Sequence, residues 1–123
     1  MQQISFIPAS IQIAEGIRLC GNQPELYFRL LSLFPSDPSV PRLEESLAKG
    51  DITSAFRYAH TLKGLCAQLA LPALQEDARI VCDILRNTDT KSLSDAKEML
   101  PVLKADYRTI CSDIHRLLNR YLP

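Results

Sequence analysis

The sequence predicts an all-α protein, an antiparallel four-helix bundle preceded by a short N-terminal helix. Along most of the 123-residue chain, apolar residues recur every three or four positions, which is the spacing of one helix face. Almost no stretch shows the strict polar–apolar alternation of a half-buried strand. Proline, glycine, asparagine and serine interrupt the apolar pattern where helices would end. The length fits one domain over residues 1–123. Periodicity alone leaves an orthogonal helical arrangement open.

Two helices are predicted in the N-terminal part of the chain. Ser10 suits the N-cap of a short first helix, which Gly21 ends. Asn22 suits the next N-cap, because Pro24 and Glu25 follow it in the first turn. The side chains that we expect this second helix to bury are Leu26, Leu30, Leu33 and Phe34.

The middle of the chain predicts a connector, a short helix and a long helix. The segment 35–41, PSDPSVP, contains three prolines and cannot be helical throughout, so we expect a connector. A short helix follows over about 41–49, and Gly50 suits its C-terminal end. Asp51 suits the N-cap of a long helix from 52 to about 70.

Two further long helices complete the predicted bundle. Pro72 begins the first, which ends near Asn87. Its apolar stripe consists of Leu74, Ala78, Val81 and Leu85. Ser94 is expected to cap the last helix, and Pro101 to kink it or to lie in its first turn. The apolar repeat of that helix is Leu103, Tyr107, Ile110, Ile114, Leu117 and Tyr121.

Composition and charge exclude several classes of function. The chain has 14 Lys+Arg and 14 Asp+Glu, so it lacks the excess of positive charge that nucleic-acid binding requires. The start MQQISFIPAS does not resemble a signal peptide, and no apolar run is long enough to span a bilayer. The four cysteines are widely spaced without a CxxC motif, which favours reduced, buried thiols and indicates no metal site. We expect a cytoplasmic protein without membrane insertion.

His60 stands out within the long central helix, in the stretch YAHTLKGLCAQLA. With about 100° per residue, the leucines of this stretch point about 140–200° away from His60. These leucines are Leu62, Leu65 and Leu69. The imidazole is therefore expected on the solvent face of the helix rather than in the core.

The neighbours of His60 on that face suit one kind of chemistry. A neutral imidazole nitrogen is a competent nucleophile near pH 7, and a phosphoryl group on it would bring negative charge that Lys63 can neutralise. Gly64 costs about 1 kcal/mol relative to alanine inside a helix. Together with Ala67, it leaves room for a partner, and Phe56 offers that partner an apolar anchor. The alternatives are that His60 is an ordinary surface histidine and that Gly64 only permits close packing of a neighbouring helix.

The hexapeptide AHTLKG at 59–64 resembles the signature of the histidine-containing phosphotransfer (HPt) domains of bacterial two-component phosphorelays. LCGNQPELYFRLLSLF at 19–34 is similar to the first long helix of that family. LEESLAKGD at 43–51 is similar to its segment before the histidine helix. The resemblance covers about residues 11–87 and implies the same four-helix bundle.

By this resemblance, His60 is the phosphoaccepting residue, and Lys63 and Gly64 are the matched lysine and glycine beside it. The family often has further glycines and an asparagine in the next two turns, where this chain has Ala67 and Gln68. Alanine keeps the surface low, and Gln68 retains an amide. The remaining neighbour expected to contact a partner is Arg57.

On the following helix, some members of the family place a Gln or Glu that helps to orient the imidazole or the phosphoryl group. The equivalent position in this chain falls near Cys82, which cannot serve in that way. Gln75, Arg79 and Arg86 are the candidates to replace it.

The resemblance implies a phosphoryl carrier rather than an enzyme. It would accept the group on His60 from the aspartyl phosphate of a receiver domain, such as that of a hybrid sensor kinase, and pass it reversibly to another receiver. The receiver would supply Mg²⁺, since this chain has no cofactor motif and no nucleotide-binding loop. We expect a monomer, and the initial Met favours a free-standing protein. The alternatives are a domain of a chemotaxis-type histidine kinase and a helical adaptor that binds receivers without transfer.

Overall fold

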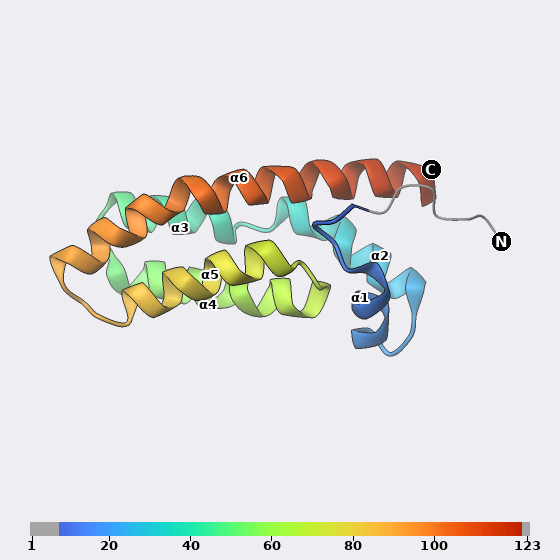
Figure 1. The fold of residues 1–123 in the computed structure, drawn as a ribbon, viewed down its shortest axis with the longest axis horizontal. Helices are drawn as coiled ribbons and strands as arrows, with labels where there is room; N and C mark the ends of the chain where they lie inside the picture. The colour runs from blue at the N-terminus through green and yellow to red at the C-terminus, as the bar shows by residue number, and fades with distance from the viewer. Residues whose placement is uncertain (1–7, 122–123) are drawn as a thin grey trace.

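The structure, a computed structural model, describes residues 8–121 and is all-α (Figure 1). The helices are α1 (Ile13–Leu19), α2 (Pro24–Leu33), α3 (Ser39–Ala48), α4 (Ile52–Leu69), α5 (Pro72–Leu85) and α6 (Thr90–Tyr121), with a 3₁₀ turn, η1, at Phe34–Ser36. No strand occurs among the described residues, and the predicted fold class is confirmed. Residues 1–7 lie outside the described part, and so does the side chain of Tyr121. Most of the N-terminal stretch on which the signal-peptide prediction rests is therefore not described.

The bundle is built from α4, α5, α6 and a fourth, interrupted element. The helix α4 packs against α3 on one side and α5 on the other, and α6 packs against α5 and α3. The helices α2 and α3 follow each other along α6, joined through η1, so they share the fourth position (Figure 1). The short α1 contacts α2 and α4 at one end of the bundle. This arrangement exposes one face of α4, the helix that carries His60.

Apolar side chains from every helix form one continuous core. The fully buried members with the largest side chains include Leu43, Leu47, Leu62, Leu69, Leu74, Leu85, Leu103 and Ile110. The apolar stripe predicted for α5 is buried in full. Cys20, Cys66 and Cys82 are buried free thiols, as the sequence predicted, whereas Cys111 is free but only half-buried.

Both ends of α4 are defined by local signals. The Asp51 side chain accepts a hydrogen bond from the Ser54 backbone N–H at 3.1 Å, so the predicted N-cap is confirmed. Gly50 precedes it with φ of +71°, in the left-handed region that favours glycine. At the other end, Ala70 has φ of +60° and stops the helix. The helix therefore holds His60 in its middle, away from fraying ends.

The N-terminal helices are tied to the C-terminal end of α4. The hydroxyl of Tyr27, a fully buried residue in α2, donates a hydrogen bond to the Leu69 carbonyl oxygen at 2.8 Å. The Gln12 backbone N–H donates to the Ala70 carbonyl oxygen at 2.9 Å. Gly16 in α1 makes room for the tyrosine ring, because a Cβ there would lie 2.1 Å from Tyr27 Cε1. Two carbonyls that α4 leaves unpaired thus receive donors from α1 and α2.

The buried face of α2 differs from the prediction. Of the four side chains expected in the core, only Phe34 is buried. The other three are exposed or half-buried: Leu26, Leu30 and Leu33. Tyr27 and Leu31 are fully buried instead, because the contacts of α2 with α1 and α6 turn a neighbouring face inward. The predicted buried face of α2 was therefore wrong. Leu33 is 62 % exposed and leaves apolar surface open to solvent.

The predicted N-caps of α1 and α2 were wrong. The Ser10 hydroxyl donates a hydrogen bond to Asp113 Oδ2 in α6 at 2.7 Å, which joins distant parts of the chain instead of capping a helix. Asn22 has φ of +59° and precedes the observed N-cap residue, Gln23. Pro101 lies well inside α6 on its exposed side, so the alternative that placed it in the first turn was also wrong.

Two helices begin earlier than predicted, and an aspartate precedes each of them. The Asp37 side chain accepts a hydrogen bond from the Ser39 backbone N–H at 2.9 Å, and α3 begins there. The Asp89 side chain accepts one from the Ser92 backbone N–H at 2.7 Å, so α6 begins before Ser94, its predicted cap. In each case an aspartate side chain accepts a hydrogen bond from the first turn and stabilises the start of the helix.

One buried carboxyl lies between α5 and α6. Asp77 is 6 % exposed, and its Oδ2 is buried without a hydrogen-bond partner. Burial raises the pKa of Asp77 to about 7, and a hydrogen bond to Asp106 together with the charge of Asp106 adds to the rise. A proton shared with Asp106 therefore satisfies this atom at neutral and lower pH.

Candidate functional site

His60 lies on the exposed face of α4, as the helical spacing predicted. Ala59 and Leu62, on either side of it in the sequence, are buried. The imidazole therefore projects from a rigid helix whose opposite face is fixed in the core. Such a placement presents a nucleophile to a partner without a loop that must first become ordered.

The small residues beside His60 leave open space at the surface. Gly64 is exposed, and a Cβ built on it would have no atom within 4 Å apart from its own helix backbone and chain neighbours. This glycine therefore serves no internal packing, and the alternative of close helix–helix contact is excluded for the described residues. Ala67, one turn further along, is half-buried, and its methyl side chain also projects little from the helix surface. Gly64 therefore leaves this part of the α4 surface without side-chain bulk.

The two basic neighbours of His60 on α4 differ in their exposure to solvent. Arg57 is exposed, whereas Lys63 is half-buried. The positive charges of Lys63 and Arg86 both act on the thiol of Cys82, although burial is the larger effect and raises the pKa of that thiol. The Lys63 side chain thus lies along the α4–α5 seam, close to Cys82. Lys63 from α4 and Arg86 from α5 thus bring two positive charges close to Cys82.

The α5 residues considered as replacements for an orienting Gln or Glu differ in their burial and in their ion pairs. Cys82 is fully buried. Arg79 is occupied by Glu76 and Asp83, with its Nη2 at 2.6 Å from Glu76 Oε1 and its Nη1 at 2.7 Å from Asp83 Oδ2. Arg86 makes only a longer contact, 3.6 Å, with Asp83. Among the three candidates, Arg86 is the one whose charge acts on the Cys82 thiol together with that of Lys63.

Phe56 contacts His60 directly. The phenyl and imidazole rings are stacked, with centroids 6.1 Å apart and an interplanar angle of 10°. Phe56 is half-buried and packs on the core. Its position one turn before His60 agrees with the helical spacing, but the sequence could not show that the rings are parallel.

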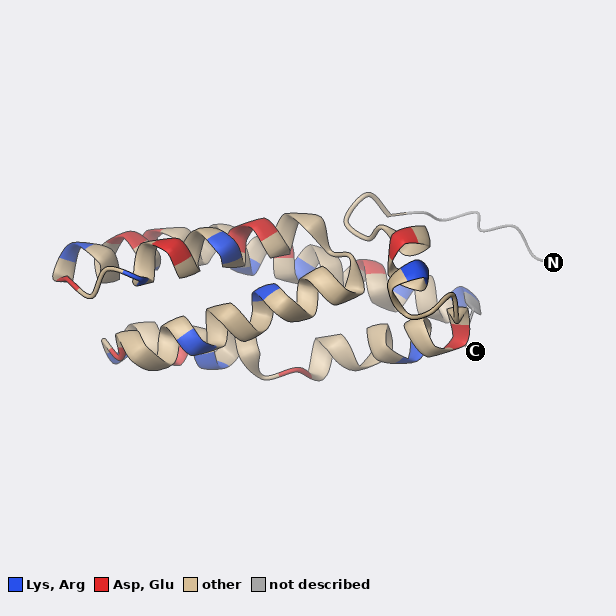
Figure 2. Cartoon of the chain, turned by 90° about the horizontal axis from the view of Figure 1, so that it is seen from below, with Lys and Arg blue, Asp and Glu red and all other residues tan. Residues whose placement is uncertain are grey.

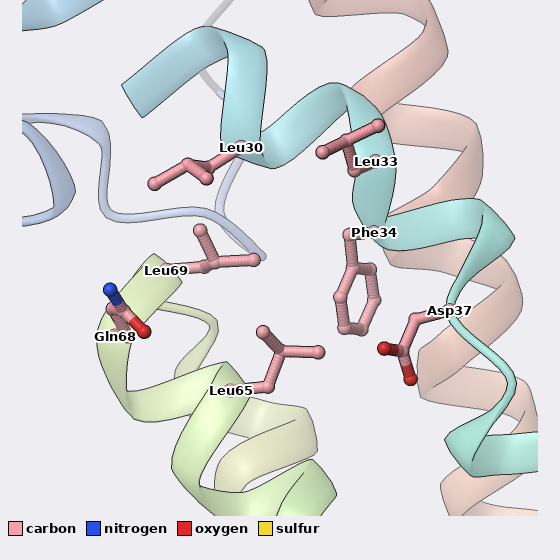
Figure 3. A pocket seen from close by; sticks show the side chains of 7 residues that line it. All are labelled: Leu30, Leu33, Phe34, Asp37, Leu65, Gln68 and Leu69. Atoms are coloured by element: carbon pink, nitrogen blue, oxygen red, sulfur yellow. The ribbon is translucent and has the colours of Figure 1, made fainter. Parts of the chain in front are cut away.

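A groove that the sequence did not predict lies beyond Gln68. It has a volume of about 230 Å³ and forms where α2 and η1 face the last turns of α4 (Figure 3). Its lining residues are Leu30, Leu33, Phe34, Asp37, Leu65, Gln68 and Leu69. Gln68 lies at one edge and Asp37 at the other, with leucines between them (Figure 3). The signal that could have indicated it is the excess of leucines in α2, more than one buried face can use.

Basic and acidic positions are mixed along the helices on the side of the molecule seen in Figure 2. Residues 8–121 contain no group of three or more His, Cys, Asp or Glu side chains that could hold a metal ion. Within the same range, no helix is both long enough and apolar enough to cross a membrane.

Comparison with known proteins identifies one family. A family model described as Hpt domain matches residues 36–118, which is more than half of the chain. The matched segment contains α4 and α5 in full and hence the whole surface around His60; α1 and α2 precede it. No curated protein and no solved structure matches the chain at a significant level.

Proposed function

The chain belongs to the Hpt domain family, and on this premise we propose that His60 is its phosphoryl-accepting residue. Hpt domains act as phosphocarrier modules in two-component systems and interact with receiver domains. In our proposal, this chain takes the phosphoryl group from the aspartyl phosphate of one receiver and passes it to the aspartate of another. Either direction is available, because the donor and the acceptor are the same kind of domain.

The observation that carries this proposal is the cleared surface at Gly64, one turn after an exposed histidine. Gly64 lacks any packing neighbour that would explain its cost of about 1 kcal/mol in the helix. Direct transfer needs the histidine nitrogen and the phosphorus of a docked receiver to come within about 3–3.5 Å. A flat surface around His60 supports that approach, and Ala67 extends it.

The proposed step is a phosphoryl transfer between two side chains. A neutral imidazole nitrogen of His60 attacks phosphorus, so an N–P bond forms while the acyl O–P bond of the donor breaks. The electron pair of that bond leaves with the aspartate carboxylate of the receiver. Lys63 stabilises the added negative charge. The receiver brings Mg²⁺, and we propose that this chain binds no ATP and acts as a monomer.

The remaining residues of the exposed face have proposed docking roles. Arg57 and Gln68 offer polar contacts to a receiver on opposite flanks of Gly64. Phe56 was expected from the sequence to be an apolar anchor for the partner, and its ring also stacks on the imidazole of His60.

The experiment that tests the proposed function is label transfer from a phosphorylated receiver. We expect the wild type to become labelled and His60→Gln to remain unlabelled, with the label stable to base and labile to acid. A His115→Gln variant is the matched control, because it removes the other histidine from an exposed position of α6. Label on His60→Gln equal to that on the wild type would refute the assignment.

Gly64 offers a separate test of the docking surface. We expect Gly64→Gln to fold normally and to lose most of its transfer, because its side chain would occupy the space that a receiver needs. Gly64→Ala should instead raise the free energy of unfolding by up to about 1 kcal/mol and retain transfer. Urea unfolding and label transfer measure the two effects. If Gly64→Gln transfers at the wild-type rate, the cleared surface has no role in docking.

A further inference from the structure

The stacked pair of Phe56 and His60 links an exposed imidazole to the core. An exposed histidine normally samples several staggered χ1 rotamers and a broad range of χ2. Here a phenyl ring lies nearly parallel to the imidazole, at an angle of 10° and a centroid distance of 6.1 Å. These values lie within the range of offset-stacked aromatic pairs.

Phe56 is itself supported by the core of the bundle. It packs on the core from α4 and borders a cavity of about 300 Å³ at the end where α5 terminates. The residues lining this cavity are Ile52, Thr53, Phe56, Leu85, Arg86 and Thr88. The ring that contacts His60 thus has a fixed support.

No hydrogen bond orients the imidazole within residues 8–121 of the structure. Cys82 on α5, the position at which the family resemblance places an orienting Gln or Glu, is fully buried and carries a thiol. Arg79, another candidate, is engaged by two carboxylates. The contact with Phe56 is therefore the one interaction in this range that fixes the plane of the ring.

We propose that Phe56 is a positioning residue, whose ring holds the imidazole plane of His60 in the orientation required for in-line attack on a docked aspartyl phosphate. This inference rests on the proposed function of His60. The lone pair that attacks phosphorus lies in the plane of the imidazole, so a contact with the face of the ring restrains it and leaves the nitrogen uncovered. Stacking on Phe56 thus restrains the ring plane in a structure whose described residues give the imidazole no hydrogen bond.

Transfer kinetics can distinguish whether Phe56 positions His60 or anchors the partner. A positioning residue lowers the transfer rate at saturating receiver and leaves the half-saturating receiver concentration unchanged. An anchor for the partner has the opposite signature, since it contributes to binding. Transfer from phosphoramidate, a small donor with no fixed direction of approach, should not depend on the ring plane.

The test compares Phe56→Leu, which keeps an apolar side chain and loses the flat ring, with Phe56→Tyr, which keeps the ring. In NMR spectra, we expect the carbon-bound imidazole protons of His60 to move in Phe56→Leu, because the ring current of the phenyl group is lost, and to stay near their wild-type shifts in Phe56→Tyr. Unchanged shifts in Phe56→Leu would show that the rings do not stack and would overturn the proposal.

The kinetic arm uses the same two variants with a phosphorylated receiver. For Phe56→Leu, we expect the saturated transfer rate to fall about twofold to tenfold, the factor that corresponds to the usual strength of an aromatic pair. Phe56→Tyr should restore it, and phosphoramidate should label all three proteins at similar rates. A higher half-saturating concentration with an unchanged saturated rate would overturn positioning in favour of docking.

The two levels of the hypothesis fail in different ways. If the wild type takes no label on His60 from receivers or from phosphoramidate, the proposed function is refuted and the positioning role with it, whatever the NMR spectra show. If the wild type is labelled and Phe56→Leu transfers at the wild-type saturated rate, only the positioning role is refuted.

Discussion

Replacing Asp77 by asparagine should make the protein more stable at alkaline pH. Asp77 lies between α5 and α6 with Oδ2 buried and unpartnered, and burial together with Asp106 raises its pKa to about 7. Above that pH, the native state must hold a buried carboxylate next to a second one. Asparagine has similar volume, carries no charge, and can donate from its amide to the Asp106 carboxylate. The substitution therefore removes a cost that only the ionised acid imposes.

The sign and the size of this effect follow from proton linkage. Unfolded chains ionise this aspartate near its ordinary pKa of 3.8, whereas the native protein retains the proton up to about pH 7. Between these values the native state binds more protons, so the wild-type free energy of unfolding falls as pH rises. The difference of about three pH units corresponds to about 4 kcal/mol as an upper limit, because relaxation and water reduce the real cost.

Urea unfolding followed by circular dichroism at several pH values measures the effect. At pH 4 the variant and the wild type should differ by less than about 1 kcal/mol, and the difference should grow toward pH 8 in favour of Asp77→Asn. Asp83→Asn is a matched control on the same helix, because Asp83 is exposed and its ion pairs are worth about 1 kcal/mol or less. An Asp77→Asn difference that is the same at pH 5 and at pH 8 would refute the reasoning.

Three other substitutions test the scaffold and the site. Tyr27→Phe removes the donor to the Leu69 carbonyl and should cost about 1–3 kcal/mol in urea unfolding; no loss would mean that water replaces the hydroxyl. Gly16→Ala should cost about 1–3 kcal/mol, because its Cβ would overlap the tyrosine ring; a stabilised variant would contradict the close approach. Lys63→Ala should slow transfer to His60, or shorten the lifetime of the phosphohistidine, by about twofold to fivefold with unchanged circular dichroism. Wild-type values in both assays would leave Lys63 without its role.

The sequence predicted those parts of the fold that depend on local signals. Helical periodicity placed His60 on the exposed face of α4, and the Gly50–Asp51 pair marked the start of that helix. Both features involve residues within a few positions of each other. The same reasoning chose Ser94 as the cap of the last helix, where Asp89 performs the task, because single residues do not show which of several nearby acceptors a turn will use.

Features that depend on contacts between distant segments could not be predicted. The buried face of α2 is set by the fit of Tyr27 against Gly16, which periodicity does not describe. The groove beyond Gln68 exists because Leu33 remains exposed next to the end of α4. Asp77 lies on the buried side of α5, and only the packing of α6 brings a second carboxyl to it.

The hydrogen bonds at the end of α4 also bear on where the autonomous folding unit begins. The family match starts at residue 36, yet the carbonyls of Leu69 and Ala70 are satisfied by Tyr27 and Gln12, both upstream of it. A fragment limited to 36–118 would leave these acceptors to water and uncover the apolar surface beneath α2. The histidine helix thus receives hydrogen bonds from segments outside the matched region, and we expect the minimal cooperative unit of this protein to be longer than its family signature.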